Sequence, residues 1–557
     1  MELKFLTPTE VWEGFDPAQG ALENSIVSSE TVDNLVCSKQ FFTAETTDDG
    51  RIRAYCEIYY DKRWADDRAA VLILPSLDDT KYISLVKRLV ENGYVACILD
   101  YCGLNEGDAP HTTFPKEYSY ASLPECLSHL TEINGDARRT PWFVWAKIAR
   151  KAISCLQEQR VVAADRIGVM GLGTGAQIAW QVAGMDKRVR ALVPINGDGY
   201  LWAEGKPRFA SSNIPSSDEE VAFSTGVGAE SYAKFVTCPT FIITSADSTY
   251  SDVDRAGDIL SFVRSKSKQL IITRGSDSQI SVRAFELMLL WLRNNFARDG
   301  KIPQDPSIEF TAIENGLYIK LNTREAAADQ HVYICYGEPY PFARYWKSID
   351  DTLQKTGEFE YTCNVPVFDP NELIVAYATV SYPDGNAVST PVSATIPSKL
   401  HVTDNALAEN KFSHIIYNSS MGVGSFTAIT DDALLDESVI YLKDGPFNIK
   451  GISTTKGSLS LCHDVHDLNN LARSAALHLD AYSPTPKTLY VEMSTSPEKK
   501  KYSASYRLNG GEFWQKVLLE PSDFKSENGK TLSKFSDTKR LIIVNAEGVA
   551  FNNFLWI

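Results

Sequence analysis

The sequence lacks the features that mark membrane-spanning, disulfide-bonded and nucleic-acid-binding proteins. Its 557 residues contain no apolar run as long as the roughly 18 residues that a transmembrane helix needs. Lys and Arg number 55 against 71 Asp and Glu, and the net charge of −16 repels nucleic acid and anionic membranes, so neither is an expected partner. The ten cysteines form no Cys-x-x-Cys pair.

The placement of the cysteines and the first residues of the chain indicate a compartment. Cys56, Cys97 and Cys155 sit in apolar runs, where cysteine serves as a small hydrophobic residue, and this favours a reducing environment over a disulfide framework. Residues 1–8 show no basic segment followed by an apolar stretch of signal-peptide length. We therefore expect a cytoplasmic protein.

The length of the chain predicts several domains, because a single core rarely spans so many residues. After an N-terminal arm (residues 1–36), short apolar strands alternate with helical patterns over residues 37–300, which predicts a doubly wound, mostly parallel sheet. Two long insertions, 104–141 and 197–236, leave from carboxyl ends of strands. Ligands bind at that edge of such sheets, so we expect the insertions to cover a site.

The periodicity changes after residue 300 and only strand patterns remain. Residues 301–399 contain short strands typical of an immunoglobulin-like β-sandwich. Residues 400–557 are again rich in strands and turns, over a length that suits a β jelly roll. The expected architecture is therefore multidomain: one α/β domain followed by two β domains.

The α/β domain is organised around the segment Arg166–Trp180, RIGVMGLGTGAQIAW. A short apolar strand turns at once into a helical pattern, as in the nucleophile elbow G-x-Nu-x-G. Gly171 and Gly175 occupy the outer positions, while the nucleophile position holds Gly173, which has no side chain. An alternative interpretation is a glycine-rich turn that cradles a phosphate. The segment lacks the lysine of a P-loop and the spacing of a dinucleotide fingerprint, so we expect no cofactor.

The order of elements and this elbow resemble the α/β-hydrolase fold, and most closely its dienelactone hydrolase and acetyl-xylan-esterase-like branch. The resemblance covers roughly residues 37–298 and includes Tyr94–Gly103, which is similar to a family strand ending in Asp-Tyr-x-Gly. It implies that Asp247 is the aligned catalytic acid and that Ser278 occupies the position of the catalytic histidine. It also implies oxyanion-hole donors at Thr174 and in the loop that contains Ser76 and Leu77.

Two of the three triad members are therefore missing at their aligned positions, and the chain has no histidine between His129 and His331. Loss of the nucleophile or histidine costs on the order of a millionfold in comparable enzymes. The Thr174 hydroxyl and His111, in the first insertion, are the candidates for a substitute nucleophile and base; alternatively, His111 is an exposed loop residue. Asp247 also has an alternative role as a structural cap after its strand.

The last domain offers two weaker candidate sites. His463 and His466 have carboxylates between and beside them, as in a metal site, although a polar surface turn is the simpler interpretation. The region resembles jelly-roll carbohydrate-binding and galactose-binding-like domains, in which Trp514 would stack on a sugar.

We predict a degenerate α/β hydrolase that acts as a binding or assembly protein, with a carbohydrate, an acylated small molecule or a protein as partner. The alternative is an active ester hydrolase of the dienelactone hydrolase or acyl-carbohydrate esterase type that uses non-standard residues. A purely architectural homo-oligomer is a third possibility that the sequence leaves open.

Overall fold

The structure, a computed structural model, describes the chain except for residues 1, 79, 104–108, 134, 204, 211–215, 275–278, 298–301, 404–406, 409–413 and 463–470, and except for the side chains of residues 128 and 202. In the described part, no helix is long and apolar enough to cross a membrane.

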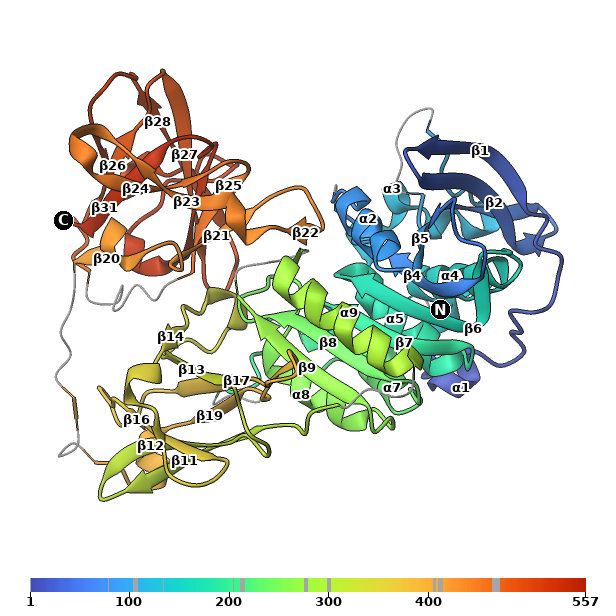
Figure 1. Ribbon diagram of the computed structural model, residues 1–557, viewed down its shortest axis with the longest axis horizontal. Coiled ribbons are helices and arrows are strands. Elements are labelled where there is room, and N and C mark those ends of the chain that lie inside the picture. The colour runs from blue at the N-terminus through green and yellow to red at the C-terminus, as the bar shows by residue number, and fades with distance from the viewer. Residues whose placement is uncertain are drawn as a thin grey trace.

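The N-terminal half is built on a nine-stranded sheet in the order β1-β2-β3-β5-β4-β6-β7-β8-β9 (Figure 1). The strands β1 to β3 and their junction with β5 are antiparallel, whereas β5, β4 and β6 to β9 are parallel. This confirms the predicted mostly parallel sheet. The bounds are β1 (Ser25–Val32), β2 (Leu35–Thr47), β3 (Gly50–Asp61), β4 (Arg68–Leu74), β5 (Val95–Asp100), β6 (Val162–Leu172), β7 (Val189–Ile195), β8 (Thr240–Ser245) and β9 (Lys268–Thr273).

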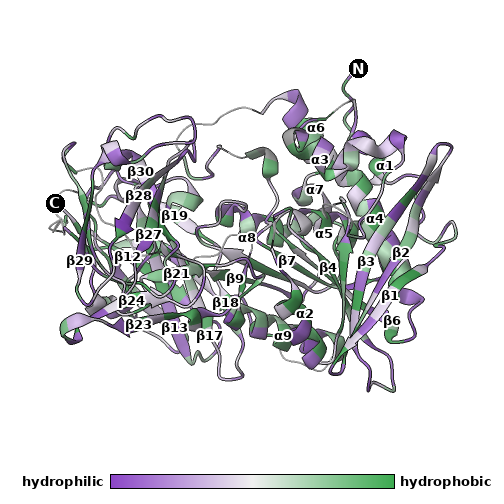
Figure 2. Ribbon diagram, turned by 90° about the horizontal axis from the view of Figure 1, so that it is seen from above, coloured by the Kyte–Doolittle hydropathy of each residue, from purple (hydrophilic) through white to green (hydrophobic). Residues whose placement is uncertain are grey.

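Helices cover both faces of this sheet, as the continuous apolar runs of its strands require. In Figure 2 the central strands lie between α4 (Pro141–Gln157) and α5 (Thr174–Met185) on one side and α2 (Ile83–Glu91) and α9 (Val282–Ala297) on the other. Strand β4 supplies both cores: Leu72 belongs to the cluster that contains α4 and α5, and Ile73 to the cluster that contains α2 and α9.

The residues expected in an N-terminal arm include one helix and one strand. Helix α1 (Pro8–Val11) and the residues after it pack against α4, where the Arg150 guanidinium lies 4.5 Å from the centre of the Trp12 ring. Residues 25–32 form β1, so this part of the expected arm is the edge strand of the sheet. The run SIVSSETV alone gives no sign of which strand it pairs with, because its partner is selected by register.

The two insertions carry short helices. The first contains η1 (Lys116–Ala121), α3 (Leu123–Cys126), η2 (Leu127–His129) and η3 (Ala137–Arg139). The second contains η4 (Leu201–Ala203), α6 (Asp218–Gly226) and α7 (Ala229–Ala233), and α8 (Val253–Phe262) follows β8. Helix α6 begins at a capping box in which Ser217 and Glu220 satisfy each other's backbone N–H groups.

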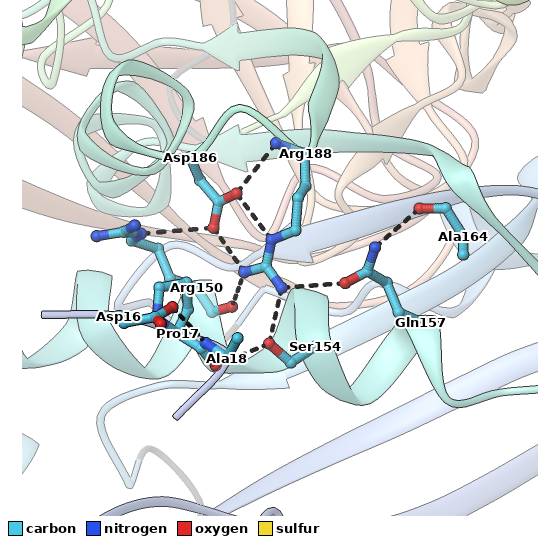
Figure 3. Close-up of polar contacts among 9 residues, drawn as sticks. All are labelled: Asp16, Pro17, Ala18, Arg150, Ser154, Gln157, Ala164, Asp186 and Arg188. Carbon is cyan, nitrogen blue, oxygen red and sulfur yellow. Dashed lines mark hydrogen bonds and ion pairs between the residues drawn. The ribbon is translucent and has the colours of Figure 1, made fainter. Parts of the chain in front are cut away.

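A buried ion network ties α4 to the segment between α5 and β7 (Figure 3). The Asp186 carboxylate accepts hydrogen bonds from Arg188 at 2.7 Å and Arg150 at 3.4 Å. Arg188 also donates to Ser154 Oγ at 2.8 Å and to Gln157 Oε1 at 3.0 Å. Burial alone raises the pKa of Asp186, but the hydrogen bond and charge of Arg188, together with Arg150, lower it overall. The network therefore fixes the end of α5 that lies away from its first residue, Thr174.

The remainder of the chain is rich in strands, in two regions. The middle region has one sheet of β11 (Ser307–Ile313), β12 (Gly316–Asn322), β16 (Glu360–Val365) and β15 (Gln354–Lys355), and another of β14 (Lys347–Ser348), β13 (Asp329–Tyr336), β17 (Ile374–Ser381), β18 (Ala387–Ser389) and β19 (Ser393–Thr395). Side chains from both sheets, such as Ile319 and Ala376, form one core.

The C-terminal region likewise has two sheets around its own core. One contains β20 (Ile415–Tyr417), β23 (Ile440–Asp444), β24 (Lys450–Thr454), β31 (Ala550–Trp556), β26 (Leu477–Tyr482) and β29 (Gln515–Leu519). The other contains β21 (Phe426–Ile429), β25 (Ser458–Leu461), β30 (Thr538–Val544), β27 (Lys487–Thr495) and β28 (Lys501–Leu508).

Both β regions make specific contacts with the α/β region. Arg344, in the middle region, forms a bidentate ion pair with Asp254 of α8, and neither side chain is exposed. From the C-terminal region, β22 (Leu434–Leu435) pairs in parallel with β10 (Ile280–Ser281), just before α9. The Ile272 N–H of the edge strand β9 donates to Ser389 Oγ of β18 at 2.9 Å. These contacts hold loops of both β regions near the carboxyl edge of the sheet.

Candidate functional site

The turn between β6 and α5 has the backbone of a nucleophile elbow. Gly173 has φ 52° and ψ −115°, a conformation that L residues rarely adopt, and its N–H donates to the Ile195 carbonyl at 2.8 Å. A Cβ on Gly171 would lie 2.2 Å from the Gly175 carbonyl oxygen, and one on Gly175 would lie 2.0 Å from that of Leu74. The two outer glycines are therefore sterically required, as the motif predicted.

The position of the missing nucleophile faces Ser76. A Cβ on Gly173 would lie 2.9 Å from Ser76 Oγ, in a buried position, because Ser76 is 2% exposed. The Ser76 N–H already donates to Tyr82 Oη at 2.8 Å, so this predicted oxyanion donor is engaged within the protein. The neighbouring Leu77 is half-buried and packs against the core.

Thr174 is the first residue of α5 and is half-buried. The first N–H groups of a helix have no intrahelical acceptor, and the positive end of the helix dipole favours an oxygen atom there. The backbone at Thr174 thus retains the predicted capacity to bind a carbonyl or hydroxyl oxygen, beside a glycine that leaves room for it.

Asp247 lies in the loop that follows β8 and is 9% exposed. Its Oδ1 accepts a hydrogen bond from Ser245 Oγ at 2.8 Å, and the adjacent Ala246 carbonyl accepts one from Trp346 Nε1 at 3.1 Å. The aligned acid is thus held firmly by its own strand and by the middle β region. Ser278, the residue at the histidine position, lies outside the described residues.

The elbow opens into a cleft with a volume of 620 Å³. Gly173, Thr174 and Gln177 lie along one side, and Trp142 and the first insertion (Leu130 and Thr131) along another. This is the size of an ordinary small-molecule site, which is commonly about 300–1,000 Å³. The predicted position of a site at the carboxyl edge of the sheet therefore coincides with a cleft of suitable size.

The other walls come from segments far apart in the sequence. They are the second insertion (199–207), the loop after β8 (248–252), the segment Tyr340–Phe342 of the middle region, and the segment Pro497–Lys499 of the C-terminal region. Lys499 Nζ donates to the Thr249 carbonyl at 3.1 Å and lies 5.0 Å from the centre of the Phe342 ring, joining three of these walls. Sequence reasoning missed the last two segments, because no local motif marks a loop that reaches another domain.

A buried acid stands just behind this cleft. Asp198 follows β7 and is not exposed; its Oδ2 accepts from Thr244 Oγ1, and within the described part of the chain its buried Oδ1 has no hydrogen-bond partner. Burial raises the pKa of Asp198 to about 7, and nearby Asp252 adds to the rise, against hydrogen bonds from Thr244 and Ser251. Gly199 and Ser251, which flank the carboxylate, line the cleft.

Asp198 was not predicted from the sequence, although a signal existed. It lies in Asn196-Gly-Asp-Gly199, directly after an apolar strand, at the edge where sites form. Gly197 packs against the elbow: a Cβ there would lie 2.8 Å from the Gly173 carbonyl oxygen. Two glycines that flank an acid at this edge of the sheet are a sequence pattern that marks Asp198 as a candidate site residue.

Two of the remaining candidates, His111 and Trp514, are not among the described residues that line the cleft. The ring Nδ1 of His111 lies 2.9 Å from the Ala109 carbonyl. Trp514 is half-buried, donates from Nε1 to the Pro446 carbonyl at 3.1 Å and packs on Tyr482 with ring centres 5.9 Å apart. His463 and His466 lie outside the described residues, in which no cluster of metal-ligating side chains is found.

The strand order, the elbow and the position of Asp247 define the N-terminal region as an α/β-hydrolase domain. Residues 59–227 match the model of the dienelactone hydrolase family, the branch of the fold that the resemblance predicted. The matched segment includes the elbow and the Ser76 loop. No curated protein matches the chain.

Solved structures of two esterases are among the similar folds. A glucuronoyl esterase from Solibacter usitatus is 11% identical, with 52% of this chain and 91% of that chain covered and a TM-score of 0.38. An acetyl xylan esterase from Paenibacillus sp. R4 is 14% identical, with 50% and 90% covered and a TM-score of 0.39.

Proposed function

We propose that this protein binds a small molecule at an α/β-hydrolase site that lacks its nucleophile and catalytic histidine, and does not hydrolyse it. The observation that carries the proposal is the elbow at Gly173, which keeps the backbone conformation of a nucleophile while lacking a side chain, and which opens into a 620 Å³ cleft. Glycine at this position removes the nucleophilic side chain. It leaves space and a helix N-terminus that can bind a ligand oxygen.

The groups around the cleft favour a largely uncharged ligand. Trp142, Tyr200 and Phe342 supply aromatic surface, and Ser248, Thr249 and Ser251 supply short polar groups. Lys206 in the wall is paired with Glu220 at 2.6 Å, and Lys499 is bound to the Thr249 carbonyl. Aromatic faces with nearby hydroxyls suit an acylated small molecule or a carbohydrate.

We assign the two β regions to an immunoglobulin-like β-sandwich and a jelly roll, and we propose that they complete this binding site. Both reach the cleft, through Tyr340–Phe342 and Pro497–Lys499. Contact with a glycan or another protein, or assembly into an oligomer, is the remaining role we propose for their outer surfaces. Trp514 would take part through the exposed part of its ring, because its Nε1 is bound to Pro446.

The alternative function is ester hydrolysis with non-standard residues. It is favoured by the family match, which spans the elbow, and by the Thr174 hydroxyl next to the nucleophile position. This alternative requires a base, and no histidine is present in the sequence between His129 and His331. A hydroxyl that no base activates is a weak nucleophile at neutral pH.

The test is hydrolysis of 4-nitrophenyl acetate and butyrate, measured together with the quenching of Trp142 fluorescence by the same esters. We expect wild type to remain at the blank rate, and the Gly173→Ser/Ser278→His double variant to turn over measurably. Trp142→Phe identifies the signal that arises in the cleft, and Trp514→Phe is the matched tryptophan control. Wild-type turnover that is lost in Asp247→Ala or Thr174→Ala would replace the binding proposal with the esterase alternative.

A further inference from the structure

A second cavity, with a volume of 280 Å³, lies where the three regions of the chain meet. Its walls are the carboxyl end of β9 (Ile271–Arg274), the first turns of α9, strands β13 and β17, and β21 with Cys462. Among the described residues it shares no lining residue with the elbow cleft. It is therefore a separate space, formed only when all three regions are docked.

Tyr377 lines this cavity and has an unsatisfied hydroxyl. The residue is fully buried, and its ring is fixed between Tyr333, stacked at 5.0 Å, and the edge of Trp346 at 4.8 Å. Within the described part of the chain its Oη has no hydrogen-bond partner. A buried polar group without a partner costs about 1–3 kcal/mol, so such a group in a native structure calls for an explanation.

Arg274, which also lines the cavity, supplies a positive charge. Its guanidinium lies 5.0 Å from the centre of the Tyr333 ring, and no ion pair or hydrogen bond involving it is found among the described residues. Arg274 acts electrostatically on Tyr377, as does Asp247, whose carboxylate is already bound to Ser245. A planar guanidinium fork beside a hydroxyl donor is the arrangement that recognises carboxylates and phosphates.

The other charged groups around the cavity are paired with neighbouring residues or lie exposed. The His331 ring lies between two carboxylates, with Nε2 3.1 Å from Asp329 and Nδ1 2.8 Å from Asp350. Arg283 donates to Ser381 Oγ at 3.2 Å, and Glu437 is exposed at the rim. Burial raises the pKa of the Cys462 thiol to about 12, so it adds no negative charge at neutral pH.

We propose that this interdomain cavity binds a small molecule through an oxoanion group, a carboxylate or a phosphate, held by the Arg274 guanidinium and the Tyr377 hydroxyl. The apolar wall formed by Ile272 and Phe426 would contact the rest of the ligand. Occupancy would also favour the docked arrangement of the three regions, because each of them contributes to the walls.

Isothermal titration and thermal unfolding of the full chain with inorganic phosphate, acetate and benzoate test this site, against sodium chloride at equal ionic strength. We expect at least one probe to bind and to raise the Tm beyond the salt control. Arg274→Gln should weaken binding about tenfold or more, because it removes the charge-assisted fork. Arg283→Gln, which also lines the cavity but is engaged with Ser381, is the matched control and should stay within about twofold.

Tyr377→Phe separates binding from folding. Because the hydroxyl has no hydrogen-bond partner among the described residues, the variant should unfold at the same temperature as wild type or higher in the absence of probe, yet bind the probe more weakly. The preference for phosphate over the two carboxylates identifies the oxoanion. The proposal is overturned if no probe exceeds the salt control, or if Arg274→Gln binds as wild type does.

Discussion

The two ends of strand β7 carry buried acids in opposite circumstances. Asp186, before the strand, is 5% exposed and is held by Arg150 and Arg188, which together lower its pKa. Asp198, after the strand, is not exposed at all, and burial raises its pKa to about 7. One acid is fully paired, whereas the other has a carboxylate oxygen without a partner in the described chain.

This difference teaches where the domain is optimised for stability and where it is not. The Asp186 end lies away from the elbow, and both oxygens of its carboxylate accept hydrogen bonds from arginine (Figure 3). The Asp198 end adjoins the strained Gly173 and the cleft. Unsatisfied or strained groups tend to cluster at functional sites, where stability is given up for a prepared geometry.

The largest effect on stability should come from removing the ion pairs of Asp186. Asp186→Asn leaves two arginines without a counter-charge, and Arg150 is itself buried, so we expect a loss of about 3–5 kcal/mol in the free energy of unfolding at pH 7. The comparison is chemical denaturation of Asp186→Asn against Asp258→Asn, which removes a more exposed pair with Arg208. A loss below that of the control would contradict the stabilising role.

The same pair sets the sign of one pH effect. Because the folded-state pKa of Asp186 is depressed, its contribution is present above the unfolded pKa of about 3.9 and is lost as pH falls through the folded value. In denaturation experiments over a series of pH values, the free energies of unfolding of Asp186→Asn and wild type should therefore approach each other at the acid end.

Asp198→Asn should act in the opposite direction. The raised folded pKa means that the contribution of Asp198 is complete below about pH 4 and is lost as pH rises through about 7. The neutral variant avoids a buried charge, so at pH 8 we expect its free energy of unfolding to exceed that of wild type by about 4 kcal/mol, with the two converging below about pH 4. Equal stability at pH 8 would show that Asp198 is ionised and paired.

Gly173→Ala should produce the smallest of these changes. Alanine there would have a strained backbone conformation, and its Cβ would lie 2.9 Å from Ser76 Oγ. We therefore expect a loss of about 1–3 kcal/mol in the free energy of unfolding. In the double variant with Ser76→Gly the contact is relieved and only the backbone strain remains. A stabilising Gly173→Ala would mean that the turn relaxes out of the elbow conformation.

Sequence reasoning succeeded where the information is local or periodic. The alternation of strands and helices over residues 37–300 and the elbow between Gly171 and Gly175 were both predictable, because hydrophobic period and glycine conformation depend on neighbouring residues. The vacancy at Gly173 is likewise a fact of the sequence. The pairing of β1 was not readable, since register depends on a partner strand.

What the sequence by itself determined is the α/β-hydrolase frame, the glycines that its elbow requires, and the absence of a side chain at Gly173. The tertiary structure alone decided that Tyr340–Phe342 and Pro497–Lys499 line the cleft, that Asp198 is buried behind it, and that Arg274 and Tyr377 line the same second cavity. The reason is physical: burial, unsatisfied hydrogen bonds and shifted pKa values are properties of a three-dimensional environment, and segments hundreds of residues apart create it.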